Sequence, residues 1–492
     1  MRKNLTTLGH IGLALLLFAA SVACADSVQE ALQLGKNAMQ TADYEEAVKH
    51  FTRGMKIDAQ NAELHFLRAT AYDRLGHNDK AMEDYNTAIK LDPKYTVALN
   101  NRGRLHYKLR QYDAAIQDHT RVLELNPANA LALYNRGNAH IRKGEFEHAI
   151  ADFTKAIEIN PNDADAYNNR GSALLQQKQV DKAIEDFDKA IELNPKQALA
   201  HYNRGDARQR KGDFDRAIED FTHAIELKPQ YARAYHKRGN AHFQKGELDA
   251  AIQDYDRAIR IDPDFADPYN NRGWTNFQLG RRDKALGDIS KAVSLNPHLA
   301  TAYSNRGWIL KEQGDCKAAV ADFDKALELN KDQPGVNAAR GACLVELGQF
   351  DRAAQDLRRA LHAEESDAGM LSVLGLLEER QGKYQAAVDL FTRLAKQRPD
   401  DPSVQYDLGV ALGKTGDFPQ AVMHLSEAIR LDPLHRQAYI KRGLAYEFLS
   451  QRTDAAEDFR KALEIPREQD KKVAPPRQVV TDDRVKQMLA HP

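Results

Sequence analysis

Small and apolar side chains recur along this chain with a period of 34 residues, which predicts a stack of similar units rather than separate globular domains. The first repeat begins at Val28, and numbering each repeat from position 1 to position 34 aligns the chain with itself. Position 20 is alanine in all thirteen repeats, from Ala47 to Ala455, and position 8 is always glycine or alanine. Larger side chains there would overpack two closely approaching helices. Each repeat is therefore predicted to be an antiparallel pair of helices.

The residues around the turn of each pair are typical of helix ends. Position 15 is glycine in nine repeats, beginning with Gly76, and glycine readily takes the left-handed conformation that ends a helix. Aspartates three positions later, such as Asp79, suit the start of the second helix, as caps or through the helix dipole. Position 32 is most often proline, as at Pro93, and proline stops the second helix before the next repeat begins.

Together with an aromatic residue at position 24, such as Phe153, and alanine at position 27, these features resemble the tetratricopeptide repeat. The resemblance covers residues 28–469 as thirteen tandem repeats. It implies an all-α fold, a right-handed superhelical solenoid of antiparallel helix pairs whose first helices line a concave groove. We expect a regular block to about residue 333 and a divergent block from about residue 334. Residues 470–492 are expected to form a linker and a short capping helix.

The amino-terminal residues have the pattern of a secretory signal peptide. Basic residues open the chain, an apolar run follows, and small residues precede Asp26, so residues 1–25 are predicted to be removed by cleavage after Ala25. The alternative is lipid attachment at Cys24, because the preceding residues resemble a bacterial lipoprotein box. Both readings predict an exported protein of the bacterial cell envelope, either periplasmic or an outer-membrane lipoprotein.

The net charge and the hydropathy of the chain argue against nucleic acid as a partner and against a membrane span. Lysine plus arginine total 70 against 71 acidic residues, so there is no net field to hold nucleic acid. The mature chain contains no apolar stretch near the roughly 20 residues that a membrane span needs. Binding must therefore depend on local surfaces, and protein or peptide partners are expected.

Arginine at position 7 and aspartate at position 23 occur together in ten repeats and are both absent from the other three. In an antiparallel pair the two positions lie at nearly the same level, so an ion pair is predicted within each repeat. Its role is expected to be mainly architectural. The alternative is a ladder of arginines that binds carboxylates. The predicted ion pairs include Arg102–Asp118, Arg136–Asp152, Arg170–Asp186, Arg204–Asp220 and Arg238–Asp254.

The resemblance also indicates candidate groove residues, because in the family positions 2, 5, 9, 12 and 13 tend to face the groove and position 6 lies close to it. Aromatic side chains at two of these positions predict an anchor for a peptide side chain, with packing between helices as the alternative: Trp274, Trp308, Phe243 and Phe277. Asparagines at position 6 are suited to an extended peptide backbone, with local helix hydrogen bonding as the alternative: Asn101, Asn135, Asn169, Asn203, Asn271 and Asn305. A modestly basic groove segment suited to acidic partners is formed by Arg104, Lys108 and Arg142.

The sequence offers no pattern typical of catalysis, a cofactor or a metal. It contains no glycine-rich phosphate loop, no His-Glu-x-x-His, no Cys-x-x-Cys and no nucleophile elbow. Histidines at position 11 are expected to pack rather than to bind a metal: His106, His140 and His242. Cys316 and Cys343 occupy apolar positions of adjacent repeats and are expected to be buried as small hydrophobic residues, with pairing of the thiols as the alternative.

These observations favour a non-enzymatic scaffold that binds peptide or protein segments in a concave groove within the cell envelope. One alternative is a factor for polysaccharide secretion or outer-membrane assembly. A second is the substrate-binding subunit of a protein O-glycosyltransferase that lacks its own catalytic domain. A third is a purely structural spacer.

Overall fold

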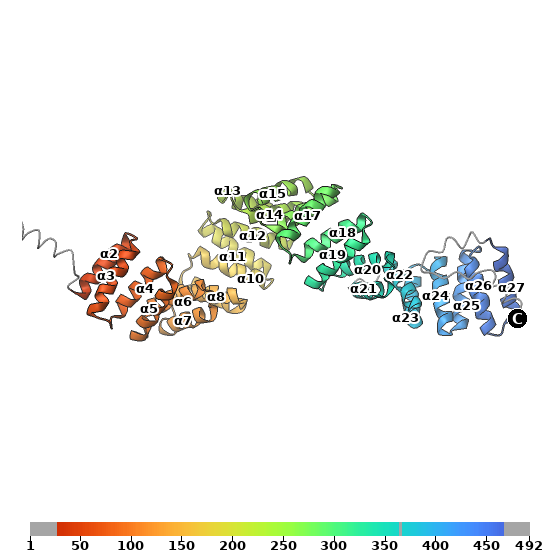
Figure 1. Ribbon diagram of the computed structural model, residues 1–492, viewed down its shortest axis with the longest axis horizontal. Helices are drawn as coiled ribbons and strands as arrows, with labels where there is room; N and C mark the ends of the chain where they lie inside the picture. The colour runs from red at the N-terminus through yellow and green to blue at the C-terminus, as the bar shows by residue number, and fades with distance from the viewer. Residues whose placement is uncertain (1–26, 364–366, 467–492) are drawn as a thin grey trace, which may run out of the picture. The chain divides into compact units, whose positions relative to one another are not determined.

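The computed structural model describes residues 27–363 and 367–466, in which all regular secondary structure is helical (Figure 1). The predicted signal peptide with Cys24, and the predicted linker and capping helix at 470–492, lie outside these residues. The described residues belong to two compact units that divide within α15 (Leu248–Ile261). No helix in these residues is long and apolar enough to cross a membrane.

The first unit contains the helices α2 (Val28–Gln40), α3 (Tyr44–Ile57), α4 (Ala62–Arg74), α5 (Asn78–Leu91), α6 (Thr96–Lys108), α7 (Tyr112–Leu125), α8 (Ala130–Lys143), α9 (Phe146–Ile159), α10 (Ala164–Gln176), α11 (Val180–Leu193), α12 (Ala198–Lys211), α13 (Phe214–Leu227) and α14 (Ala232–Gln244). The second unit contains α16 (Ala266–Gln278), α17 (Arg282–Leu295), α18 (Ala300–Glu312), α19 (Cys316–Leu329), α20 (Pro334–Glu346), α21 (Phe350–Ala363), α22 (Ala368–Arg380), α23 (Tyr384–Gln397), α24 (Pro402–Thr415), α25 (Phe418–Leu431), α26 (Arg436–Phe448) and α27 (Arg452–Glu464).

The helix boundaries follow the 34-residue register. The first helix of every repeat begins at position 1 and the second at position 17, from α2 and α3 to α26 and α27. The predicted all-α array of helix pairs is therefore confirmed.

Within a repeat, the small residue at position 8 lies against the side chain at position 24, which in most repeats is a ring. A Cβ atom added to Gly171 would lie 2.8 Å from the ring of Phe187 and 3.1 Å from the carbonyl oxygen of Ala183. Both Phe187 and Ala183, at positions 24 and 20, are fully buried. The close approach predicted from positions 8 and 20 is thus present, because at Gly171 even a Cβ atom would press on the ring and on the facing backbone.

The turn glycines have the predicted left-handed conformation, with φ of 79° at Gly144, for example. The repeats that lack glycine at position 15 keep this conformation, as Lys178 does at φ 62°. The aspartates at position 18 lie in the first turn of the second helix, and Asp215 is an example. The cap itself is at position 16, where the side chain of Asp213 accepts from the backbone nitrogen of Arg216. Position 18 therefore acts through charge in the first turn and not as the cap.

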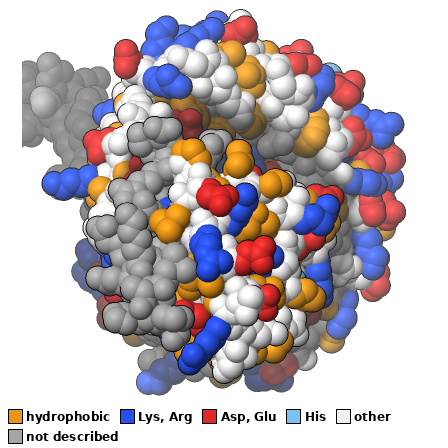
Figure 2. Space-filling model, turned by 90° about the vertical axis from the view of Figure 1, so that its right-hand side faces the viewer, with side chains coloured by type: hydrophobic (Ala, Val, Ile, Leu, Met, Phe, Trp, Pro, Cys, Tyr) orange, Lys and Arg blue, Asp and Glu red, His pale blue; other side chains and the backbone are white. Residues whose placement is uncertain are grey.

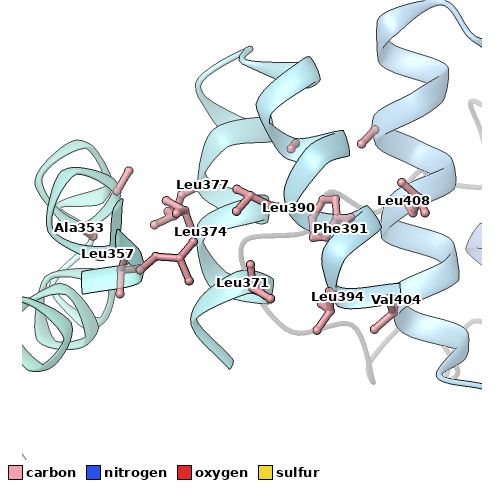
Figure 3. Close-up of a cluster of buried hydrophobic side chains, with 14 of the residues drawn as sticks. Ala353, Leu357, Leu371, Leu374, Leu377, Leu390, Phe391, Leu394, Val404 and Leu408 are labelled. Atoms are coloured by element: carbon pink, nitrogen blue, oxygen red, sulfur yellow. The ribbon is translucent and has the colours of Figure 1, made fainter. Parts of the chain in front are cut away.

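Buried apolar side chains form a continuous cluster from α19 to α26, whereas the other clusters are each confined to a few adjacent helices. Figure 3 shows Leu371, Leu374 and Leu377 of α22 between α21 and α23. Leu374 and Leu408 occupy position 7, where most repeats have arginine, and each is only 2% exposed. Apolar packing therefore replaces the ion pair in these two repeats.

Candidate functional site

The predicted ion pair is present in each repeat that has both residues within one unit. In repeat 4, Arg136 donates from Nε to Asp152 Oδ2 at 2.8 Å and from Nη2 to Oδ1 at 2.7 Å. Asp152 is 4% exposed. The equivalent pairs are Arg68–Asp84, Arg102–Asp118, Arg170–Asp186, Arg204–Asp220, Arg272–Asp288, Arg306–Asp322, Arg340–Asp356 and Arg442–Asp458. The remaining predicted partners, Arg238 and Asp254, fall on the two sides of the division between the units.

The same guanidinium also reaches the preceding repeat, a contact that the sequence analysis missed. Nη1 of Arg136 donates to Thr120 Oγ1 at 3.0 Å, and Nη1 of Arg170 donates to Thr154 Oγ1 at 3.2 Å. Thr120 and Thr154 occupy position 25, which elsewhere holds other oxygen-bearing side chains such as Asp324. The hydrogen bond to Asp186 raises the pKa of Arg170. Because these guanidinium groups are engaged on both sides, they join adjacent repeats, and a ladder of arginines open to ligand carboxylates is not what the contacts describe.

Asparagines of the predicted row are linked to one another across repeats. Asn203 donates to Asn168 Oδ1 at 2.9 Å, and Asn168 donates to Asn169 Oδ1 at 3.1 Å. Asn169 in turn donates to Asn138 Oδ1 at 2.9 Å and to the hydroxyl of Tyr134 at 3.1 Å. This relay connects three successive first helices, α8, α10 and α12, and it uses the donors that a peptide backbone would need.

The second unit repeats the arrangement. Asn305 donates to Asn270 Oδ1, and Asn270 donates to Asn271 Oδ1, each at 3.0 Å. The side-chain nitrogen of Asn135 is buried without a hydrogen-bond partner among the described residues. Asn169, Asn203 and Asn305 of the row are thus occupied by contacts between repeats.

The rings of the predicted aromatic anchor make separate contacts with different neighbours. Trp274 lies against Phe277 of the same helix, with ring centroids 5.3 Å apart. Trp308 packs edge-on against the buried ring of Phe323, with centroids 6.1 Å apart, and borders the large apolar cluster. Phe243 is half-buried and belongs to the first unit. Packing between helices is thus present for Trp308, whereas Trp274 contacts a ring of its own helix.

The predicted basic segment is partly neutralised by the preceding repeats. Lys108 donates to Asp73 Oδ1 at 3.0 Å, and Arg142 donates to the hydroxyl of Tyr112 at 3.3 Å. Arg104 is exposed. Two of the three basic side chains thus contact the preceding repeat. Figure 2 shows another face, at the carboxyl-terminal end of the described residues, where basic and acidic side chains are interspersed with hydrophobic ones.

The position-11 histidines each contact the acceptor five residues later. His140 Nδ1 lies 2.7 Å from Glu145 Oε2, and its candidate ligand atom lies within 4.8 Å of those of Glu145 and His148. Lys143 also contacts Glu145, at 2.5 Å. Repeats that do not form such a group make the same contact, at 2.6 Å in His106–Gln111 and in His242–Glu247. The histidine therefore joins the two helices of its own repeat.

An apolar hollow that the sequence analysis missed lies between α24, α25 and α26. It has a volume of about 130 Å³, close to the size of an engineered cavity that binds benzene. Phe448, 70% exposed, stacks on Phe418 with centroids 4.4 Å apart and an interplanar angle of 6°. Together with these two rings, the lining consists of Gly409, Val410, Gly413, Lys414, Ala421, Leu425, Lys441, Leu444 and Ala445.

Much of this lining falls at the positions that the resemblance assigns to the groove. Val410, Gly413 and Lys414 occupy positions 9, 12 and 13 of repeat 12, and Leu444 and Phe448 occupy positions 9 and 13 of repeat 13. The signal in the sequence was the missing side chain at Gly413 beside an aromatic residue at position 13. The hollow suits one aliphatic or aromatic side chain, and Lys414 suits a neighbouring carboxylate.

Family models described as tetratricopeptide repeat or TPR repeat match most of the residues between 62 and 469. The matched segments are 62–95, 96–129, 137–178, 164–197, 187–219, 209–246, 239–280, 266–299, 300–333, 340–402, 380–444 and 437–469.

Curated relatives are matched over short segments. The chain is 34% identical over 73 residues to the TPR repeat-containing thioredoxin TTL4 of Arabidopsis thaliana, covering 15% of this chain and 11% of that protein. It is 38% identical over 61 residues to the small glutamine-rich tetratricopeptide repeat-containing protein 2 of Saccharomyces cerevisiae, covering 12% and 18%. The match thus spans less than a fifth of either relative.

Among solved structures, a crystal structure of MamA is similar to part of the chain, at 30% identity and a TM-score of 0.31, covering 33% of this chain and 94% of that one. The family models and the thirteen helix pairs in one register agree with each other. The chain therefore belongs to the tetratricopeptide repeat proteins.

Proposed function

We propose that this protein is a non-enzymatic scaffold of the bacterial cell envelope that binds an extended peptide segment and holds one of its apolar side chains in the hollow between α24 and α26. Arrays of this kind bind partners on the extended surfaces that their stacked repeats create. The observation that carries the proposal is the exposed ring of Phe448 beside an open apolar hollow at groove positions.

The hollow supports this proposal better than the predicted tryptophans do. A binding hot spot combines a large apolar contact with a pocket from which water is expelled. Part of the surface of Trp308 is already buried against Phe323, whereas Phe448 contacts Phe418 on one face and remains 70% exposed. Lys414 in the lining favours a peptide with an acidic residue or a terminal carboxylate next to its apolar side chain.

Peptide binding is tested by selecting short peptides from a random library and measuring their dissociation constants by fluorescence anisotropy. Phe448→Ala is expected to weaken a selected peptide about 30-fold, the equivalent of about 2 kcal/mol at a hot spot. Met423→Ala is the matched control, because Met423 lies on α25, is 55% exposed and does not line the hollow. Equal affinities of the wild-type chain and Phe448→Ala would contradict the proposal.

Export is supported by the signal-peptide pattern of residues 1–25. It is tested separately, by fractionating cells that produce the full chain and measuring the mass of the product. A product that begins at Asp26 in the periplasmic fraction is expected. A membrane-bound product that carries lipid on Cys24 would favour the lipoprotein alternative, and an uncleaved cytoplasmic chain would contradict export.

A further inference from the structure

Two thiols meet at the junction between repeats 9 and 10. Cys316 Sγ lies 2.6 Å from Cys343 Sγ and 3.0 Å from Glu346 Oε2. Cys316 begins α19, and Cys343 lies in α20 of the next repeat. The two side chains are 4% and 0% exposed. The sulfur atoms are therefore closer than a van der Waals contact and about 0.5 Å beyond the roughly 2.05 Å of a disulfide bond.

Two cysteines placed at random in this chain would rarely be in contact with each other. They are the only cysteines in the thirteen repeats. A buried residue contacts about 6 to 12 others, so a second cysteine placed at random among more than 400 residues would meet it roughly once in 50 cases. Position 17 usually holds an aromatic residue such as Phe146, and position 10 often holds alanine, as at Ala173. At this junction alone, both positions have changed to cysteine.

The surroundings decide when such a bond would form. Burial, together with the contacts to Cys343 and Glu346, raises the pKa of Cys316, and burial also raises the pKa of Cys343. Thiolate is the attacking species in disulfide exchange, so both thiols react slowly in the folded chain. The bond is therefore expected to form while the junction is open, during folding, and to be protected afterwards.

We propose that Cys316 and Cys343 form a structural disulfide bond that fastens repeat 9 to repeat 10. One cysteine thiolate attacks a small-molecule disulfide such as oxidised glutathione and releases one glutathione thiolate. The second cysteine thiolate then attacks the protein sulfur of this mixed disulfide and releases the other. The two thiol protons end on the two glutathione molecules, so the exchange is balanced. Its occurrence in the cell depends on the proposed export to an oxidising compartment, but its chemistry does not.

The bond would change how this part of the array opens. In repeat arrays each repeat contacts only its neighbours, so a junction can separate without unfolding of the rest. A covalent link between α19 and α20 removes this mode at the start of the expected divergent block. Repeats 9 and 10 then open as one unit.

The test is to refold the purified full chain in a glutathione buffer, block free thiols with N-ethylmaleimide and digest it with trypsin without reductant. Cleavage after lysine and arginine places Cys316 in the peptide 312–317 and Cys343 in the peptide 341–352. We expect the two peptides to be joined, and to separate on reduction. We also expect reductant to lower the thermal midpoint of the wild-type chain, and to leave the midpoint of the double variant Cys316→Ala, Cys343→Ala unchanged.

Two separately blocked peptides, or glutathione on one cysteine only, would overturn the proposal. The single variant Cys343→Ser shows whether the reagent reaches the junction, because Cys316 then retains glutathione as a mixed disulfide. Circular dichroism of each variant verifies that the helices are intact. Because this experiment uses purified protein, a failure of the disulfide is distinguishable from a failure of export or of peptide binding.

Discussion

His119 is expected to make repeat 3 less stable in acid. It occupies position 24 of that repeat, is 0% exposed and lies so close to Gly103 that a Cβ there would be 2.7 Å from its ring. Its Nδ1 atom lies 3.1 Å from Asn100 Oδ1, and its Nε2 atom is buried without a hydrogen-bond partner among the described residues. Burial, and to a smaller extent Arg136 and Arg104, lowers the pKa of His119 to about 4.

The direction and size of the effect follow from linkage. Between pH 6.5, the ordinary pKa of histidine, and pH 4, the unfolded chain binds a proton at His119 that the folded chain excludes. Protonation of His119 therefore does not lower the free energy of unfolding above pH 6.5, and lowers it progressively as the pH falls through this window. With about 1.4 kcal/mol for each pKa unit, the loss between pH 7 and pH 5 is about 2 kcal/mol.

The effect is measurable by native-state hydrogen exchange at α6 and α7, because a long array does not unfold in one step and local opening energies are needed. The matched variant is His119→Phe, since phenylalanine occupies the same position in other repeats, as at Phe153. Carboxylates titrate in both the wild type and the variant. The difference between their pH-dependent losses of opening free energy therefore reports on His119 alone. The wild type should lose about 2 kcal/mol more than the variant between pH 7 and pH 5. Identical losses would refute the reasoning.

Three further substitutions test the architecture, each read as a local opening energy of repeat 5. Asp186→Ala should cost about 3 to 5 kcal/mol by leaving Arg170 half-buried without its partner, and adding Arg170→Leu should recover part of it; no recovery would contradict the pairing. Gly171→Ala should cost about 1 to 3 kcal/mol because its Cβ would meet the Phe187 ring, and an unchanged energy would show that the ring can move freely. Lys178→Gly should stabilise by about 1 kcal/mol by relieving a positive φ, and destabilisation would contradict this account.

The helix pairs could be predicted from the sequence because their determinants are local and repeated. The small residue at position 8, the ring at position 24 and the left-handed turn at position 15 all act within one repeat, as Gly171, Phe187 and Gly144 show. Thirteen copies in one register made each position visible as a column. The Arg–Asp pairing was predictable for the same reason, because the two residues change together.

Contacts between repeats could not be predicted as well, because they depend on how one pair rotates against the next. The Nη1 atom of Arg136 donates to position 25 of the preceding repeat. In the repeats where it accepts from an arginine, this position holds threonine, asparagine, aspartate or serine, so it is not visible as one recurring residue type in the sequence. The asparagine relay depends on Asn168, at position 5, which the sequence analysis did not single out. The hollow depends on a side chain that is absent, at Gly413.

The two kinds of junction explain why the hollow lies where it does. An arginine that donates to its own aspartate and to the preceding repeat fixes the register through directional hydrogen bonds. Leu374 and Leu408 supply apolar contact without such directions, and their repeats join the continuous cluster. In repeat 12 the apolar lining extends from this cluster to the groove positions, where glycine leaves room. In repeat 13 an arginine is again present at position 7, and Arg442 donates to Ser426 of the preceding repeat. The hollow thus lies where the apolar cluster reaches the groove positions of repeat 12, at a junction whose register is fixed by Arg442.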